Sequence, residues 1–489
     1  MSCTYSSASV LSSPDTPPGL DKKRHTRYWL RCLRTHLPSA YIPNDSNRMT
    51  LAFFTISALD LLSSLVPNTT PEERAAYIDW IYSCQIPSGG FRASPSHDLS
   101  AVKDGSAQWD PANVPATYFA LATLLILGDD LNRVRRKETL KWLRCMQRDD
   151  GSFGETLVNG KIEGGMDTRF GYCATCVRYI LRGKREGPDP TSEEQDTDVD
   201  ALVECLRKAE TYDGGMSEMP FHEAHAGFTY CAIAALHFID RFPWPIRSQP
   251  SEGQRAFNKM PLRKEGIVST TSSEQQGGIK TRGLTSPDLT IHWLASRLTA
   301  TISSEDEEDT YADETDTPET CHDAHSFVHT ANFPTSMGET SEKSRPTSHF
   351  ALDWVGFNGR CNKVADTCYA FWVGAGLTLM NASRVIHPTP VRRYLLEQTA
   401  HIVGGFGKLP GDPPDVYHSY LGLAALSLLE TAAQAAHESP REGRDKPVEE
   451  RELKALDACM CVSIEAKSRL YAIWQRWGVH DGKDWDGGG

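Results

Sequence analysis

The heptapeptide QIPSGGF, residues 85–91, returns later in the chain in altered form, as QRDDGSF at 147–153 and ETYDGGM at 210–216. A looser copy, AHIVGGF, spans 400–406. The copies lie about 60 residues apart where no insertion intervenes. In each copy the glycines predict a tight turn with positive φ at the end of a helix, and the apolar residue after them can anchor that turn in the interior. The sequence therefore predicts a chain of repeated helical pairs.

Apolar periodicity predicts helices on both sides of these turns, and strand signals are nearly absent. A helical pair cannot bury its apolar face alone, so the pairs must stack or close into a ring. With about six pairs we expect an all-α fold, an α/α barrel of helical hairpins closed into a toroid with its turns gathered at one end. The expected helices are 23–37, 49–65, 71–85, 112–127, 136–147, 167–182, 197–209, 224–240, 286–299, 366–381, 390–401, 416–432 and 449–476.

Three polar segments interrupt this pattern, at 184–197, 241–285 and 301–350. They are rich in Ser, Thr, Glu, Asp, Pro and Gly, a composition that cannot support a core, so we expect disordered surface loops. We expect one domain over residues 22–480, a disordered N-terminal tail at 1–21 and a C-terminal tail at 481–489.

The composition excludes several classes of protein. A net charge of −13 argues against nucleic-acid binding and against a polybasic membrane patch. No apolar run approaches the ~18–20 residues of a membrane span, and the N-terminus lacks a signal-peptide core. The odd number of cysteines, 13, scattered through apolar segments, indicates free thiols. We therefore expect a cytoplasmic protein with no transmembrane segment.

The densest group of reactive side chains lies in GFNGRCNKVADTCYAFW, residues 356–372, which holds Arg360, Lys363, Asp366, Cys368 and Tyr369. Arg and Lys suit phosphate oxygens. Asp and Cys two residues apart, with a His from elsewhere, suit zinc. The alternative is a surface turn with a solvated charge pair leading into a core helix, because Asp-x-Cys alone is a weak motif.

Two histidines follow repeat turns at the entry to apolar helices, His225 in FHEAHAGF and His418 in PPDVYHSY. A lone His there is more often a helix-start hydrogen-bonder. Equivalent positions in successive repeats would, however, converge at the barrel mouth, where Asp366, Cys368 and His418 form a three-ligand zinc site with an open fourth position. Aromatic residues at inner-face spacing either fill the core or line an apolar channel; they are Tyr118, Tyr172, Phe228 and Trp372.

The segments GRCNK, DTCYAFWVGAGL, EAHAGFTYCAIAAL, DTRFGYCATC and GGFGKLP with PDVYHSY together resemble the β subunits of protein prenyltransferases. The resemblance covers residues 22–480 except the polar inserts. It implies an α/α barrel, a heterodimer with a helical-repeat α subunit, and transfer of an isoprenoid from its diphosphate to the cysteine of a C-terminal CaaX motif, as on small GTPases.

The resemblance also assigns residues by motif. It implies one Zn²⁺ ion held by Asp366, Cys368 and His418. It implies diphosphate binding by His225, Arg360, Lys363 and Tyr369, with Tyr369 and Lys408 assisting catalysis. The remaining residues would line the isoprenoid and peptide channel: Thr50, Phe54, Tyr118, Arg169, Tyr172, Phe228, Trp372 and Tyr417.

Two positions resemble the type I geranylgeranyltransferase branch of this family. Thr50 stands where farnesyltransferases carry Trp, which leaves room for one more isoprene; five carbons at ~0.8 kcal/mol each give up to ~4 kcal/mol. Lys408 stands where the farnesyl branch has a Mg²⁺-binding Asp. At ~4 Å and an effective dielectric constant of ~20, its ammonium supplies about 4 kcal/mol towards the diphosphate, so Mg²⁺ is not expected to be required.

The resemblance thus implies geranylgeranyl transfer from geranylgeranyl diphosphate. Tyr417 departs from this branch and resembles farnesyltransferases, at a position that contacts the last CaaX residue, so farnesyl transfer is the alternative. A terpene cyclase would need an Asp-x-Asp-Asp acid, and DTDVD at 196–200 lacks that pattern. A helical-repeat scaffold with a structural zinc is the non-enzymatic alternative.

Overall fold

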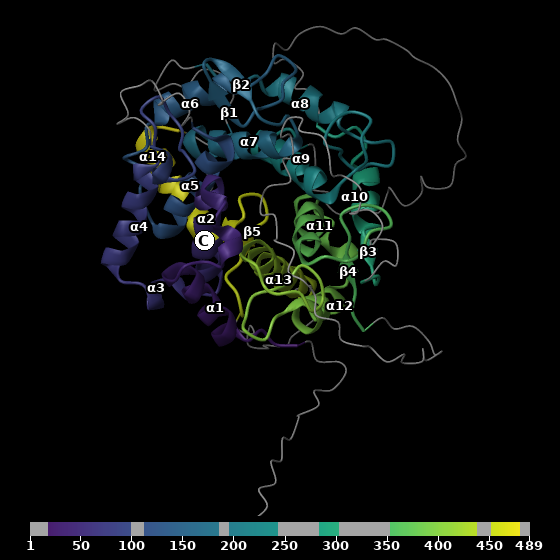
Figure 1. Ribbon diagram of the computed structural model, residues 1–489. Coiled ribbons are helices and arrows are strands. Elements are labelled where there is room, and N and C mark those ends of the chain that lie inside the picture. Colours follow the sequence, from purple (N-terminus) through teal and green to yellow (C-terminus); the bar gives the residue numbers. More distant parts are fainter. Residues whose placement is uncertain are drawn as a thin grey trace, which may run out of the picture.

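The computed structural model describes residues 18–98, 112–184, 195–242, 283–302, 353–437 and 451–479. Their core is a ring of inner helices in which each helix contacts the next and the last contacts the first, α13 against α2 (Figure 1). The predicted α/α toroid is therefore confirmed. The inner helices are α2 Arg48–Leu61, α5 Val114–Leu127, α7 Thr168–Arg182, α9 Ala226–Phe238, α11 Thr367–Leu379 and α13 Val416–His437.

An outer helix precedes each inner one in the chain. Inner helices are apolar nearly all round, since α5 is buried from Val114 through Ile126, whereas outer helices such as α8 bury a single face. The outer helices are α1 Lys22–Arg34, α4 Pro71–Ser83, α6 Arg136–Cys145, α8 Val199–Lys208, α10 Pro287–Ala295 and α12 Pro388–Arg393, the last continued by a π-helical turn at Tyr394–Thr399. A short helix, α3 Leu65–Asn68, and a C-terminal helix, α14 Ile464–Trp477, complete the fold.

The repeated turns pack directly on the backbone of the next outer helix. Their first glycines have φ between 89° and 107°, and the apolar residue that follows each turn is buried. A Cβ on Gly89 would lie 2.3 Å from the carbonyl oxygen of Glu138 in α6, and one on Gly151 would lie 2.1 Å from that of Ala201 in α8. Only glycine permits this close approach, which is why the motif recurs.

The glutamine four residues before the glycines also has a structural role. The side chain of Gln85 donates to the carbonyl of Arg133 and accepts from the N–H of Arg135, at 3.0 and 2.8 Å, directly before α6. Gln147 makes the same two bonds to the backbone of Asp198 before α8, at 2.8 and 2.7 Å. Each turn thereby fixes the start of the following repeat.

The last turn closes the ring onto the first helix. A Cβ on Gly404 would lie 2.6 Å from the carbonyl oxygen of Arg24 in α1. The N–H of Gly405 donates to Nδ1 of His25 at 3.1 Å, and the His25 ring stacks on Phe406 at 4.9 Å. Helix α1 thus occupies, at this turn, the place that the next outer helix takes elsewhere.

The described residues contain three short antiparallel strand pairs, and two of these pairs correct predicted helices. The helix expected over 286–299 ends at Ala295, because residues 298–299 pair with residues 356–357. Residues 356–357 begin the loop that leads into α11, which is called the reactive loop because it holds the reactive side chains. The helix expected over 449–476 begins only at Ile464. Two of the pairs are β-hairpins, β1 Thr156–Val158 with β2 Lys161–Glu163 and β5 Leu456–Asp457 with β6 Val462–Ser463. The third joins distant segments, β3 Leu298–Thr299 and β4 Gly356–Phe357.

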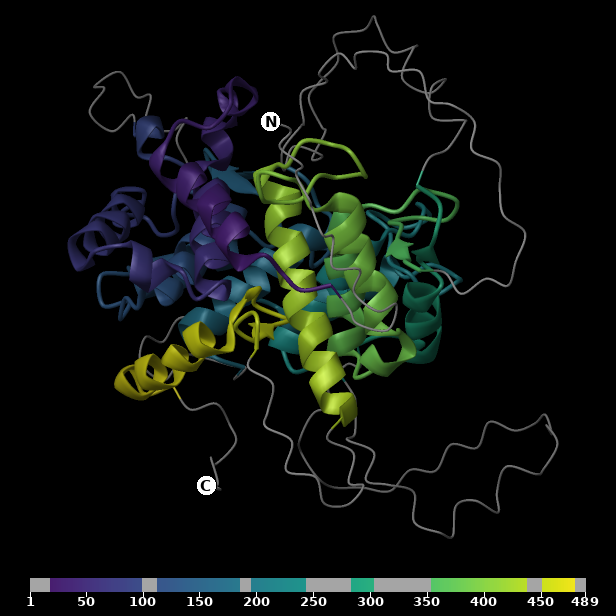
Figure 2. The ribbon, with the colours of Figure 1, turned by 90° about the horizontal axis from the view of Figure 1, so that it is seen from below.

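Most of the predicted disordered inserts and tails lie outside the described residues, and the domain boundaries stay a prediction. Within the described residues, the cysteines are free, and Cys173 and Cys176 are buried in α7 as expected for core packing. Of the helices in that part of the chain, none combines the length and apolarity needed to cross a membrane. Figure 2 shows the loop before α13 at one end of the ring and the C-terminal segment towards the other.

Candidate metal centre and active site

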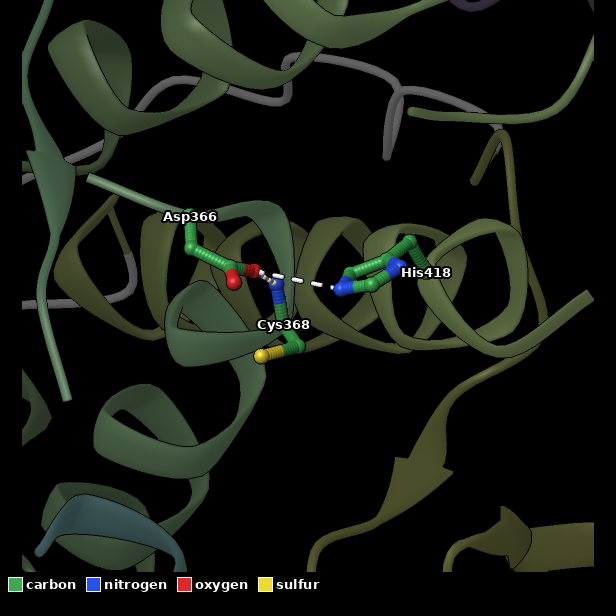
Figure 3. Close-up of side chains that lie close together, drawn as sticks. All are labelled: Asp366, Cys368 and His418. Carbon is green, nitrogen blue, oxygen red and sulfur yellow. Dashed lines mark hydrogen bonds and ion pairs between the residues drawn. The ribbon is translucent and has the colours of Figure 1, made fainter. Parts of the chain in front are cut away.

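The N-termini of two neighbouring inner helices bring three potential metal ligands together. Asp366 is the N-cap of α11, and its Oδ1 accepts from the N–H of Cys368 at 2.8 Å. His418 lies in the first turn of α13, which packs against α11. The ligand atoms of the three residues all lie within 4.8 Å of one another, and all three residues are buried (Figure 3).

This arrangement fits a zinc ion. Nε2 of His418 is 3.4 Å from Oδ1 of Asp366. Two ligands at 2.0–2.2 Å from a tetrahedral Zn²⁺ stand about 3.4 Å apart. One carboxylate, one thiol and one imidazole make three protein ligands, the number found in catalytic zinc sites that keep a fourth position for water or substrate. The residues predicted as metal ligands are thus brought together.

A fourth residue, missed by the sequence analysis, orients the imidazole. Oδ2 of Asp415 accepts from Nδ1 of His418 at 2.6 Å, and Oδ1 accepts from the His418 N–H at 2.9 Å. Because Nδ1 donates to Asp415, Nε2 is the nitrogen that faces Asp366 and is available to a metal. An aspartate three residues before a histidine at a helix start was the available signal.

Electrostatics in this cluster favour a bound cation. Burial opposes a charge on His418, but the carboxylates of Asp415 and Asp366 outweigh it and raise the pKa of His418 well above its usual value. Burial, reinforced by the negative charge of Asp366, raises the pKa of Cys368 to about 12. The two carboxylates therefore require a nearby positive charge, which a proton on His418 or a divalent cation can supply.

Beside the metal ligands, His225 and Tyr369 form a hydrogen-bonded pair. Nδ1 of His225, the N-cap of α9, accepts from the N–H of Gly227 at 3.0 Å. Its other nitrogen, Nε2, then carries the hydrogen in a neutral ring and donates to the hydroxyl oxygen of Tyr369 at 3.1 Å. The hydroxyl hydrogen of Tyr369 is consequently directed towards another acceptor.

The reactive loop is fixed closely against this pair. The N–H of Ala226 donates to the carbonyl of Gly359 at 2.9 Å, and a Cβ on Gly359 would lie 2.1 Å from the Tyr369 ring. The next residue, Arg360, is exposed and lies 3.5 Å from the carboxylate of Glu223, two residues before His225. Arg360 was a candidate from the sequence, whereas its partner Glu223 was not.

The two predicted lysines are also exposed at this end of the ring. The carbonyl of Lys408 accepts from the N–H of Thr367 at 3.0 Å, so its backbone is tied directly beside Asp366. The carbonyl of Lys363 accepts from the side chain of Asn358 at 2.9 Å. Both lysines therefore belong to loops that pack around the start of α11.

Arg169 is held by its own carboxylate. Asp167, the N-cap of α7, accepts from Nε and Nη2 of Arg169 at 2.8 and 3.0 Å, and the guanidinium lies over the Phe228 ring at 5.3 Å. The carboxylate of Asp167 offsets the positive charge of this guanidinium, which lies against the Phe228 ring. Asp167 gave no functional signal in the sequence.

Aromatic side chains line the first turns of the inner helices. Phe54, one turn after the buried Thr50 on the same face of α2, contacts Tyr417 with ring centroids 5.9 Å apart. The Trp372 ring is tilted by 54° against that of Tyr230, with ring centroids 5.1 Å apart. Tyr118 and Tyr172 contact each other at 5.4 Å, but their hydroxyls bind the C-terminal hairpin, a role the sequence analysis did not foresee.

Known proteins resemble this chain over most of its length. A protein from Arabidopsis thaliana named geranylgeranyl transferase type-1 subunit beta is 28% identical over 432 residues, 86% of this chain and 88% of that protein. The protein of the same name from Dictyostelium discoideum is 25% identical, over 83% of this chain and 90% of that protein. The protein farnesyltransferase subunit beta of Pyricularia oryzae is 25% identical, over 84% of this chain and 63% of that protein.

Comparisons of structure and of family agree on the fold. The Candida albicans protein geranylgeranyltransferase-I complexed with GGPP superposes with a TM-score of 0.63 at 22% identity, over 93% of this chain and 99% of that one. The family model of the prenyltransferase alpha-alpha toroid domain matches residues 20–462. The resemblance inferred from the motifs is confirmed, and the chain belongs to the prenyltransferase alpha-alpha toroid family.

Proposed function

We propose that this chain is the catalytic β subunit of a zinc-dependent protein geranylgeranyltransferase of type I. It transfers a geranylgeranyl group from geranylgeranyl diphosphate to the cysteine of a C-terminal CaaX motif. The observation that carries this proposal is the buried cluster of Asp366, Cys368 and His418, which lies beside the Tyr369 hydroxyl at one end of a prenyltransferase toroid. The names of the Arabidopsis and Dictyostelium relatives support the geranylgeranyl branch.

In this proposal Asp366, Cys368 and His418 hold zinc, with Asp415 orienting the imidazole. Zinc, when bound, lowers the pKa of a coordinated thiol and so keeps the acceptor cysteine as the nucleophilic thiolate.

The chain's own donors act on the leaving group. The new C–S bond forms as the C–O bond to the diphosphate breaks, and the thiol proton passes to solvent. Tyr369 donates its hydroxyl hydrogen to a diphosphate oxygen, because His225 already supplies the hydrogen bond that the tyrosine oxygen accepts. Arg360, Lys363 and Lys408 add positive charge, and Arg360 exchanges Glu223 for the diphosphate.

Thr50 and Phe54 bound the apolar channel on the side of α2. A small residue at position 50 leaves space for a fourth isoprene unit, in favour of geranylgeranyl over farnesyl. Tyr417, packed on Phe54, favours the farnesyl alternative through the peptide's last residue. We further propose a helical-repeat α subunit as partner, CaaX-terminated proteins as acceptors, and the cytoplasm as the place of action.

The test uses the chain co-expressed with its α subunit. We expect zinc close to one per β subunit and transfer of geranylgeranyl in preference to farnesyl to a CaaX peptide. Cys368→Ala and His418→Ala should lose zinc and peptide affinity but keep isoprenoid-diphosphate binding. Cys361→Ala, which removes an exposed thiol from the same loop, serves as the control. Full zinc occupancy in both ligand variants refutes the metal assignment, and a zinc-loaded enzyme without transfer refutes the function.

A further inference from the structure

Cys361 is an exposed cysteine in the reactive loop, directly after Arg360. Its sulfur lies 3.2 Å from Nη2 of Arg297, a residue that follows α10 and stands 64 residues earlier in the chain. The pairing of β3 with β4 brings the two side chains together, and the N–H of Asn358 donates to the carbonyl of Arg297 at 2.9 Å. The contact between thiol and guanidinium therefore belongs to the framework that holds the reactive loop.

Arg297 is a buried cation whose charge no described carboxylate offsets. Only 5% of its surface is accessible, and its guanidinium lies over the ring of Trp293 at 4.6 Å. Its Nη2 also donates to Oγ of Ser296 at 3.2 Å, whereas Nε and Nη1 have no hydrogen-bond partner among the described residues. A buried charge in this state is stabilised by a nearby anion, and the thiolate of Cys361 can provide one.

Cys361 differs in this respect from the other cysteines of the described residues. Only Cys145 is also exposed, and no side chain in that part of the protein forms a hydrogen bond with its thiol. Burial raises the pKa values of the half-buried Cys32 and Cys205 to about 11, which disfavours their thiolates. Since the thiolate is the form that attacks a disulfide, we expect Cys361 to react before these three thiols.

A group attached to Cys361 would lie in the proposed diphosphate site. Arg360 precedes Cys361 and Lys363 follows it by two residues, and both cations are exposed. Their positive charge attracts an anionic reagent such as glutathione disulfide. The attached half would place bulk and negative charge where the diphosphate must bind, so we expect it to compete with the diphosphate for these cations.

We propose that Cys361 is a modification site, at which a low-molecular-weight disulfide of the glutathione class forms a mixed disulfide that weakens isoprenoid-diphosphate binding. The Cys361 thiol loses its proton to solvent, and the thiolate beside Arg297 attacks one sulfur of the reagent. The new S–S bond forms as the old one breaks. Cys361 is thereby oxidised, and the leaving half is reduced to a thiolate that takes a proton from solvent. Excess thiol reverses the exchange. The effect on diphosphate binding rests on the proposed function, whereas the reaction at Cys361 does not.

The first test treats the zinc-loaded heterodimer with glutathione disulfide and follows each cysteine by mass spectrometry of its peptides. We expect the adduct to form about tenfold faster at Cys361 than at Cys145, the matched exposed thiol. Arg297→Met removes the charge but keeps most of the bulk, and should lower the rate at Cys361 about tenfold, whereas Arg297→Lys should retain most of it. Should these variants fail to fold, the comparison of the two thiols in the wild type still decides, because equal rates there overturn the inference.

The second test measures binding of geranylgeranyl diphosphate before and after modification. The adduct should weaken binding about tenfold, and dithiothreitol should restore it. Cys361→Ala should bind the diphosphate equally well with and without glutathione disulfide. Saturating diphosphate should in turn slow the modification of Cys361 but not that of Cys145. Unchanged diphosphate binding by the fully modified heterodimer overturns the inference. An unmodified heterodimer that binds no isoprenoid diphosphate contradicts the proposed function instead.

Discussion

Replacing Asp415 with asparagine tests how much the orientation of the His418 ring contributes to metal binding. Oδ1 of the amide can still accept from the His418 N–H, so the start of α13 is preserved. The amide nitrogen, however, presents hydrogens to Nδ1 in place of the acceptor now 2.6 Å away. The imidazole must then carry its hydrogen on Nε2, the nitrogen that faces Asp366, and that hydrogen blocks metal binding.

The magnitude follows from the geometry. A zinc ion on Nε2 would lie about 6–7 Å from the Asp415 carboxylate, where removing one negative charge costs at most ~5 kcal/mol at an effective dielectric constant of ~20. Loss of an outer-shell partner of a metal-bound histidine typically weakens metal binding by ~10–100-fold, or about 1.4–2.7 kcal/mol. We expect a weakening of zinc affinity within that smaller range, with full isoprenoid-diphosphate binding.

The assay is competition for zinc with a chromophoric chelator, on the heterodimer, with isoprenoid-diphosphate binding measured in parallel. Asp198→Asn is the matched control, because Asp198 is also an N-cap, accepting from the N–H of Ala201 at 2.9 Å at the start of α8. Its zinc affinity should equal that of the wild type. A zinc affinity of Asp415→Asn within twofold of the wild type refutes the orienting role of Asp415.

Three further predictions concern charge, space and pH. Lys408→Asp should slow the reaction with zinc alone and regain rate with millimolar Mg²⁺, because the carboxylate then provides a hard oxygen ligand; single-turnover rates across a Mg²⁺ titration check this. Thr50→Trp should shift preference from geranylgeranyl to farnesyl diphosphate in a competition assay, because the indole fills the space of the fourth isoprene. Burial lowers the pKa of His25 to about 4, so the contribution of His25 to stability should fall by up to ~3 kcal/mol as pH drops from 6.5 to 4. In denaturant unfolding His25→Gln should lack that contribution but keep a weaker pH dependence, because burial also lowers the pKa of His237 to about 4.

Each of these has an outcome that contradicts it. Strong Mg²⁺ dependence of the wild type would overturn the role given to Lys408 and favour the farnesyl alternative. If both diphosphates compete unchanged in Thr50→Trp, that residue does not bound the channel. The sign for His25 is fixed, since only the unfolded state takes up its proton between pH 6.5 and 4. Equal pH slopes in wild type and His25→Gln would mean that other groups produce the slope.

The sequence was most informative where structure is local or repeated. The glycine turns predicted the toroid because Gly89 and its equivalents approach the next outer helix too closely for any side chain. The proximity of the three candidate metal ligands was predictable because Asp366 and Cys368 share one helix start, and His418 occupies the matching place in the next repeat. In both cases the position of a residue within the repeat predicts where that residue lies in the fold.

Long-range hydrogen bonds could not be predicted from the position of a residue within a repeat. The hairpin at 456–463 interrupts an apparently helical segment because its carbonyls are bound by tyrosines such as Tyr118, 342 residues earlier in the chain. The end of α10 at Ala295 depends on pairing between 298–299 and 356–357, across the acidic insert. The periodicity of apolar residues along the chain is a local property and predicts neither of these long-range contacts.

The closure of the ring onto α1 has a consequence for synthesis of the chain. The bond between His25 and Gly405 spans 380 residues, and translation at ~5–20 residues per second separates the emergence of the two by roughly 20–75 s. Until the last turn emerges, the face of α1 that carries His25 and Tyr28, both buried in the finished ring, lacks its cover. A nascent chain that stalls before residue 404 therefore leaves this face of α1 uncovered, and chaperones or proteases can recognise an incomplete copy by that face.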